Sequence, residues 1–134
     1  MLPIHHLELA VTDVERAVAF YTPVLTWLGF RRSGRAAFVK DDFLLLLTPG
    51  ADAQRPARGG PGLHHLAFAV SSRAKVDRFY DEVLRRLPNA RIEDPPVDCP
   101  EYRYAEYYAT FFFDPDGTKL EVVYTSPGND ERFP

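Results

Sequence analysis

Two histidines, His6 and His65, occupy equivalent places in an internal repeat, and imidazole is the side chain that most often binds metal ions in proteins. Residues 4–25 align without a gap on residues 63–84, and nine of the 22 aligned positions are identical. In each copy the large apolar residues of the first strand alternate with the histidine, so the histidine lies on the opposite face. Both imidazoles are therefore expected to face the space between the copies. Two interpretations remain open: a metal site, or two buried histidines with satisfied hydrogen bonds.

The elements that position these histidines form two modules. A period near 60 residues is too long for most solenoid repeats and fits two copies of one small unit. Each copy is predicted as a strand, a helix and three more strands, which is an α+β fold. We expect one domain, residues 1–134, made of a module at 4–48, a linker at 49–62 rich in proline and glycine, and a module at 63–125.

The second module is expected to be longer than the first. Residues 41–48 match residues 116–123 at an offset of 75, whereas the first match has an offset of 59, which leaves about 16 extra residues. The extra length falls near residues 94–107, which are rich in proline and tyrosine and have no clear period. We predict a long loop there, and such loops are usually functional or disordered. A helix over 74–87 and a short strand at 91–93 are predicted before it.

The composition excludes several classes of protein. The chain has 134 residues, of which 46% are hydrophobic and 26% charged, a balance typical of soluble domains. Its net charge of −3 gives no electrostatic basis for a nucleic-acid partner. It has no apolar run of membrane-spanning length, and residues 1–6 do not resemble a signal peptide. A single cysteine, Cys99, excludes an internal disulfide and fits a reducing compartment. We expect a cytoplasmic protein.

Three motifs resemble the vicinal oxygen chelate superfamily, which includes glyoxalase I, fosfomycin-resistance proteins, extradiol dioxygenases and bleomycin-binding proteins. The most specific is Phe-Asp-Pro-Asp-Gly-Thr-Lys-Leu-Glu at residues 113–121. The other two are the strand at residues 6–13 followed by Phe20-Tyr21, and the strand at residues 65–70 followed by Phe79-Tyr80. The resemblance extends over nearly the whole chain.

The resemblance implies a pair of βαβββ modules whose curved sheets enclose a metal cavity. Carried over residue by residue, the metal ligands are His6, His65 and Glu121. The fourth position, a glutamate in glyoxalase I, is Leu46 here, which leaves two histidines and one carboxylate as in the fosfomycin-resistance and extradiol branches. Such a triad leaves coordination positions open and suits one divalent metal ion: Mn, Fe, Ni, Co or Zn.

Further side chains could act beside this metal. Glu8 lies two residues after His6 and shares its face, so it is a candidate general base, a replacement ligand for Leu46, or a rim residue paired with an arginine. Tyrosines of the extended second module either line the entrance or cover the sheet. We select Tyr102 and Tyr108 as candidate catalytic residues from the set Tyr102, Tyr104, Tyr107 and Tyr108.

These observations favour a metal-dependent enzyme of the glyoxalase-like lyase or isomerase type, or a resistance-type transferase, that acts on a small substrate with vicinal oxygens. The alternatives are a protein that sequesters a small molecule and an extradiol-type dioxygenase. We also expect a homodimer. In one arrangement His6 of one chain joins His65 and Glu121 of the other, and in the second each chain holds a whole site.

Overall fold

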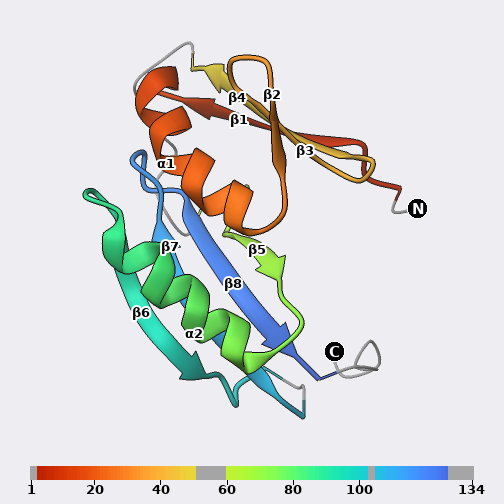
Figure 1. The fold of residues 1–134 in the computed structure, drawn as a ribbon, viewed down its shortest axis with the longest axis vertical. Helices are drawn as coiled ribbons and strands as arrows, with labels where there is room; N and C mark the ends of the chain where they lie inside the picture. The colour runs from red at the N-terminus through yellow and green to blue at the C-terminus, as the bar shows by residue number, and fades with distance from the viewer. Residues whose placement is uncertain (1–2, 51–59, 103–104, 127–134) are drawn as a thin grey trace.

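The computed structural model describes residues 3–50, 60–102 and 105–126 and arranges them as two modules with the same order of elements (Figure 1). The first module contains β1 (His6–Val11), α1 (Val14–Trp27), β2 (Arg31–Ser33), β3 (Ala37–Lys40) and β4 (Phe43–Pro49). The second contains β5 (Leu66–Ala69), α2 (Arg73–Glu82), the short 3₁₀ helix η1 (Leu84–Arg86), β6 (Arg91–Asp98), β7 (Tyr107–Phe113) and β8 (Lys119–Thr125). Most of the expected linker, residues 51–59, lies outside the described residues.

Each module folds into one four-stranded mixed sheet. The strand orders are β1-β4-β3-β2 and β5-β8-β7-β6, which are the same topology repeated. In each sheet the first strand of the module pairs in parallel with the last, and the helix and the two middle strands lie between them in the chain. The remaining pairs are antiparallel. The predicted α+β fold of two βαβββ modules is confirmed.

Helix α1 is held by its buried face. Asp13 caps its N-terminus, where the carboxylate accepts the Arg16 backbone N–H at 3.1 Å. The helix continues through Pro23 to Trp27, although an internal proline removes a backbone hydrogen bond and costs about 3 kcal/mol. Tyr21, Val24 and Leu25 on this helix are fully buried, so side-chain packing offsets that cost.

The second helix is shorter than predicted. The sequence predicts a helix over 74–87, but α2 ends at Glu82 and the chain continues as the 3₁₀ turn η1. The tighter turn brings two consecutive residues, Val83 and Leu84, into the core, where they are 6% and 1% exposed. A regular helix directs consecutive side chains about 100° apart, so the change to a 3₁₀ turn allows both side chains to pack in the core.

The predicted loop at residues 94–107 is wrong over its first part, because β6 runs to Asp98 and is not the three-residue strand at 91–93. The strand contains Pro95 and Pro96, which cannot donate a backbone hydrogen bond. It tolerates them because β6 is an edge strand and its register against β7 shifts between Ile92 and Asp94 and again between Asp94 and Val97.

The modules share one core. A single cluster of buried residues includes Phe20 of α1 and Phe112 of β7, whose ring centroids are 6.3 Å apart. The hydroxyl of Tyr21 donates to Asp114 Oδ2 at 2.7 Å, and the indole N–H of Trp27 donates to Glu82 at 2.7 Å. Asp114 begins the turn before β8, and its Oδ1 accepts the backbone N–H of Thr118 at 2.8 Å. Helix α1 therefore lies between its own sheet and the second module (Figure 1).

Removing the hydrogen bond between Tyr21 and Asp114 tests how much this contact between the modules contributes to stability. Tyr21→Phe removes the hydroxyl donor from a carboxylate that is only 5% exposed, so the free energy of unfolding should fall by about 1–3 kcal/mol in urea titrations. Tyr124→Phe is the matched control, because its hydroxyl makes a long, exposed bond of 3.4 Å to Glu106. The control should change stability by less than about 0.5 kcal/mol. An equal loss of stability in both variants would contradict a stabilising, buried hydrogen bond between the modules.

Candidate metal centre

The candidate centre lies on the face of the second sheet that α2 does not cover. Leu120 and Val122 of β8 pack in the shared core, so the alternating residues Glu121 and Val123 project to the other face. There a smaller cluster surrounds Glu121. Its buried members are Cys99, Ala109, Phe111 and Val123, and Tyr102 and Tyr107 pack against them. We name these six residues the outer cluster.

Glu121 is a fully buried carboxylate in which one oxygen accepts a hydrogen bond and the other does not. The hydroxyl of Tyr107 donates to Oε1 at 2.5 Å. Oε2 lies 2.8 Å from Nε2 of His65, whose side chain is 22% exposed. Although these two atoms are in contact, no described residue makes a hydrogen bond with Oε2. A buried polar atom of this kind needs an explanation, and an absent ion is one.

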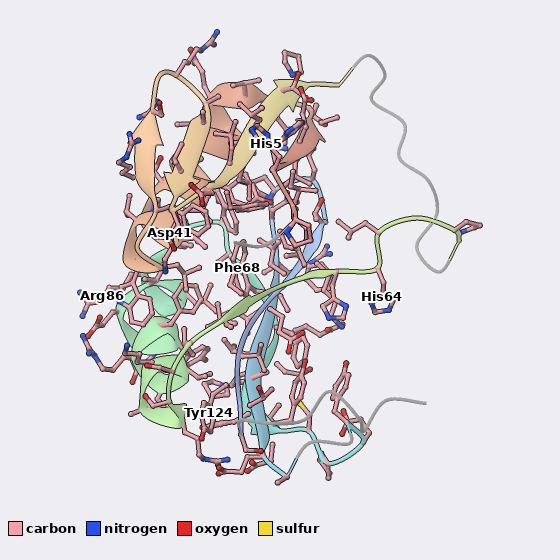
Figure 2. The ribbon with its side chains drawn as sticks, turned by 90° about the vertical axis from the view of Figure 1, so that its right-hand side faces the viewer. His5, Asp41, His64, Phe68, Arg86 and Tyr124 are labelled. Atoms are coloured by element: carbon pink, nitrogen blue, oxygen red, sulfur yellow. The ribbon has the colours of Figure 1, made fainter. Side chains whose placement is uncertain are left out.

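His65 is itself held by its neighbour. The Nδ1 atoms of His64 and His65 are 2.7 Å apart, so one ring donates and the other accepts. Figure 2 shows His64 on the segment that leads into β5. His65 precedes β5, in which Ala67 pairs with Glu121, and this register brings the imidazole to the carboxylate. A bond at Nδ1 leaves Nε2 to face Glu121.

The tyrosines divide between the two faces of the sheet. Tyr102 stacks on Tyr107 with centroids 4.2 Å apart and ring planes 11° apart, and it packs against the buried members of the outer cluster. Burial and the hydrogen bond to Glu121 raise the pKa of Tyr107 well above its ordinary value. Tyr107 was outside the selected candidates. Strand alternation was the signal for it, since Tyr107 shares a face with Ala109 and Phe111.

Tyr108 lies on the other side of β7, away from Glu121. Its hydroxyl donates to Asp77 Oδ1 at 2.6 Å, and the guanidinium of Arg73 lies 4.0 Å above its ring. The bond to Asp77, with burial, raises the pKa of Tyr108 to about 12. Tyr108, which was selected as a candidate catalytic residue, therefore lies on the opposite side of β7 from Tyr107 and Glu121, because consecutive strand residues face opposite ways. Tyr104 lies outside the described residues.

His6 and Glu8 lie on the first sheet, on the face that α1 does not cover. Both are exposed, and they pair in register with Leu44 and Leu46 of β4. His6 contacts His5 through Nδ1 atoms 2.9 Å apart, which repeats the contact between His64 and His65. Figure 2 shows His5 beside the strands of the first module. Within one chain the described residues contain no group of three metal-binding side chains, so His6 does not join His65 and Glu121 there.

The donor set of His65 and Glu121 fits a divalent transition metal. An imidazole nitrogen and a carboxylate oxygen 2.8 Å apart, without an aligned hydrogen bond, could both turn to one ion. Cys99 belongs to the outer cluster, but burial and nearby carboxylates raise the pKa of its thiol to about 11. The Cys99 sulfur contacts the Val97 carbonyl at 3.8 Å, so the fit rests on the nitrogen and oxygen atoms of His65 and Glu121 that contact each other.

A cavity of about 490 Å³ lies at the junction of the modules, along β5. Phe30, Phe43 and Phe68 line it, with centroid distances of 6.3 Å from Phe30 to Phe43 and 6.2 Å from Phe30 to Phe68. Asp41 and Ala67 belong to the lining too, and Figure 2 shows Asp41 and Phe68 at the level where the modules meet. The volume suits a small molecule. Ala67 on β5 lines the cavity and pairs with Glu121 on the neighbouring strand β8, so the cavity is close to Glu121.

Residues 3–122 match the family model described as the Glyoxalase/Bleomycin resistance protein/Dioxygenase superfamily. The chain belongs to this superfamily. Two uncharacterised Bacillus subtilis proteins, YqjT and YwkD, are each 30% identical to it, with 89% of this chain and 96% and 94% of theirs covered.

Solved structures of the superfamily share the fold. A glyoxalase/bleomycin resistance protein from Albidiferax ferrireducens T118 superposes with a TM-score of 0.68 at 23% identity, over 90% of this chain and 98% of that one. A glyoxylase/bleomycin resistance protein/dioxygenase domain from Frankia sp. EAN1pec superposes with a TM-score of 0.70 at 22% identity, over 94% of this chain and 99% of that one. No helix among the described residues of this chain is long and apolar enough to cross a membrane.

The environment of Tyr108 predicts how stability changes at alkaline pH. An unfolded tyrosine ionises near pH 10, whereas Tyr108 in the folded chain keeps its proton up to about 12. Between these values the unfolded state has lost a proton that the folded state keeps, so the free energy of unfolding falls as pH rises. Tyr108→Phe should make this fall less steep in urea titrations between about pH 9 and 11. Parallel curves for the wild type and the variant would contradict the assignment.

Proposed function

We propose that this superfamily member is a metal-dependent enzyme that acts on a small substrate with two neighbouring oxygens. His65 and Glu121 of one chain, with His6 of a second copy, would hold one divalent ion. The reaction class that we favour is that of a glyoxalase-like lyase or isomerase, or of a resistance-type transferase. Membership of the superfamily supports a protein of the glyoxalase, bleomycin-resistance or dioxygenase type. The contact between His65 and Glu121 supports the proposed metal site.

The observation that carries the proposal is Oε2 of Glu121, a fully buried oxygen that lies 2.8 Å from His65 Nε2 but makes no hydrogen bond with the described residues. Burying a carboxylate oxygen without a hydrogen bond is costly, and a chain that gains nothing from it would do better with an apolar residue. Leu46 fills the equivalent place in the first module, so the fold accepts an apolar residue there. A metal ion at Oε2 and His65 Nε2 would satisfy both donors.

A bound metal ion would supply Lewis acidity, which polarises the oxygens of a substrate. The protein's own residues would do the rest. Glu8 is exposed on the face that carries His6, where it could take a proton from a substrate carbon or hydroxyl. Tyr102, stacked on Tyr107, would form a flat aromatic wall beside the carboxylate. Together these groups would bind the substrate, limit its contact with water and move a proton.

A second copy is needed to bring His6 to this centre. The helical sides of both modules are used in the shared core, so the faces that carry the histidines point outward. Ile4 and Leu63 immediately precede the two histidine pairs at equivalent repeat positions, and they are 57% and 59% exposed. Large apolar residues left exposed at both places support contact with another copy, in which each pair would meet the other.

Metal content tests the proposed ligands directly. His6→Ala, His65→Ala and Glu121→Gln should each abolish stoichiometric binding of Mn²⁺, Co²⁺ or Zn²⁺ at neutral pH, as measured by equilibrium dialysis and elemental analysis. For the wild type, metal at 100 times its Kd should stabilise the fold by about 2.7 kcal/mol, which would appear as a higher Tm. None of the three variants should show this metal-dependent rise.

Glu106→Gln is the matched control for Glu121→Gln, because Glu106 is an exposed glutamate outside the outer cluster. It should bind metal as the wild type does. Full metal content in all three ligand variants would overturn the proposed centre. Loss of metal binding in His65→Ala and Glu121→Gln but not in His6→Ala would support a metal centre at His65 and Glu121 and would contradict a role for His6 of the second copy.

Mixing two inactive chains tests whether the site is shared. Chains with His6→Ala and with Glu121→Ala each lack one ligand type, but a heterodimer with exchanged modules contains one intact site. Metal binding should therefore return in the mixture to about a quarter of the wild-type amount per chain, if the chains mix at random. Native mass spectrometry would measure heterodimer formation. Heterodimers without any recovered metal would show that the chains do not share a site.

A second candidate function is sequestration of a small aromatic molecule, and the cavity lined by Phe30, Phe43 and Phe68 favours it. A sequestering protein would bind such a molecule equally well with and without metal. An enzyme of the proposed type would need the metal for tight binding of substrates with neighbouring oxygens. Calorimetric titration of catechols and 2-hydroxyketones into metal-free and metal-loaded protein separates the two.

A further inference from the structure

Tyr107 fixes the orientation of the Glu121 carboxylate. Its hydroxyl donates to Oε1 at 2.5 Å, which is as short as hydrogen bonds to charged oxygens become. We propose that Tyr107 is a positioning residue that occupies Oε1, so that Glu121 presents only Oε2 to a metal ion beside His65, and that Tyr102 holds the ring of Tyr107 in place. This inference rests on the metal centre proposed above.

A carboxylate can bind a metal through one oxygen or through both, and the choice changes how many positions remain for a substrate. With Oε1 engaged by the phenol, the group cannot rotate to offer both oxygens without losing a hydrogen bond in a buried place. Oε2 lies 2.8 Å from His65 Nε2 and has no hydrogen bond with the described residues. The phenol therefore determines which oxygen is available.

The segment before β7 is built to keep Tyr107 there. The backbone N–H of Cys99 donates to the Tyr107 carbonyl at 2.8 Å, and the backbone N–H of Tyr102 donates to the Cys99 carbonyl at 3.2 Å. These two bonds fold residues 99–102 back on β7, where the rings of Tyr102 and Tyr107 stack at 4.2 Å. The stack restricts rotation of the Tyr107 side chain, so its hydroxyl stays directed at Glu121.

The protonation of Tyr107 agrees with this role. A tyrosine ordinarily ionises at about pH 10, so a phenol is a hydrogen-bond donor throughout the neutral range. The Tyr107 hydroxyl thus donates a hydrogen bond to the Glu121 carboxylate, and such a bond is stronger in a buried site than in water.

Tyr107→Phe and Tyr108→Phe form a matched pair for the test. Each removes one hydroxyl that donates to a carboxylate, from adjacent positions of β7, but only Tyr107 faces Glu121. Co²⁺ is the probe, because its visible absorption reports the number and geometry of its ligands. We expect Tyr107→Phe to weaken Co²⁺ binding by about 10- to 100-fold and to change the visible spectrum of the complex. Tyr108→Phe should leave both unchanged.

Tyr102→Leu is a further variant that keeps the Tyr107 hydroxyl and removes only the stacked ring. It should weaken Co²⁺ binding less than Tyr107→Phe does, and it keeps the idea testable should Tyr107→Phe fail to fold. Wild-type affinity and spectrum in folded Tyr107→Phe, or in Tyr102→Leu if the former does not fold, would overturn the positioning role and leave the metal centre intact. A wild-type chain that binds no divalent metal would instead overturn the proposed function.

Discussion

The buried charge of Glu121 is the constraint on which the outer face of the second sheet depends. An ionised carboxylate in a low-dielectric setting costs several kcal/mol unless its oxygens are engaged, so its surroundings must supply partners. Tyr107 supplies one, and His65 lies next to the other oxygen. The aromatic rings of Tyr102 and Phe111 then keep water from competing, which makes each remaining polar contact stronger.

Much of this face could be predicted from the sequence because strand periodicity is a local property. Alternation in residues 6–11 assigns Leu9 and Val11 to the helix side and His6 and Glu8 to the other, and the structure agrees. The repeat also predicted the βαβββ order of both modules. The same rule distinguishes Tyr107, which faces Glu121, from Tyr108, which faces Asp77, so position along the strand predicts the site better there than residue type does.

Other features depend on contacts that leave no local signal. The strand β6 continues across two prolines because it lies at the edge of a sheet, and edge position is known only once the strands are ordered. Helix α2 ends early because Val83 and Leu84 must both enter the core. The placement of one module on the other depends on pairs such as Tyr21 with Asp114 and Trp27 with Glu82, which are 93 and 55 residues apart in the sequence.

That placement explains why the family resemblance implies three ligands, whereas the described residues of one chain bring only His65 and Glu121 together. Periodicity fixes the face on which His6 and His65 lie within each module, but the shared core decides where those faces point. Because α1 packs between its own sheet and the second module, the helical sides meet inside and both histidine faces remain outside. A chain built in this way can complete a site of the predicted composition by placing the His6 face of one copy against the Glu121 face of another. Two-fold symmetry would then form two such sites at once, so the cost of burying each carboxylate would be offset by the same contact that joins the chains.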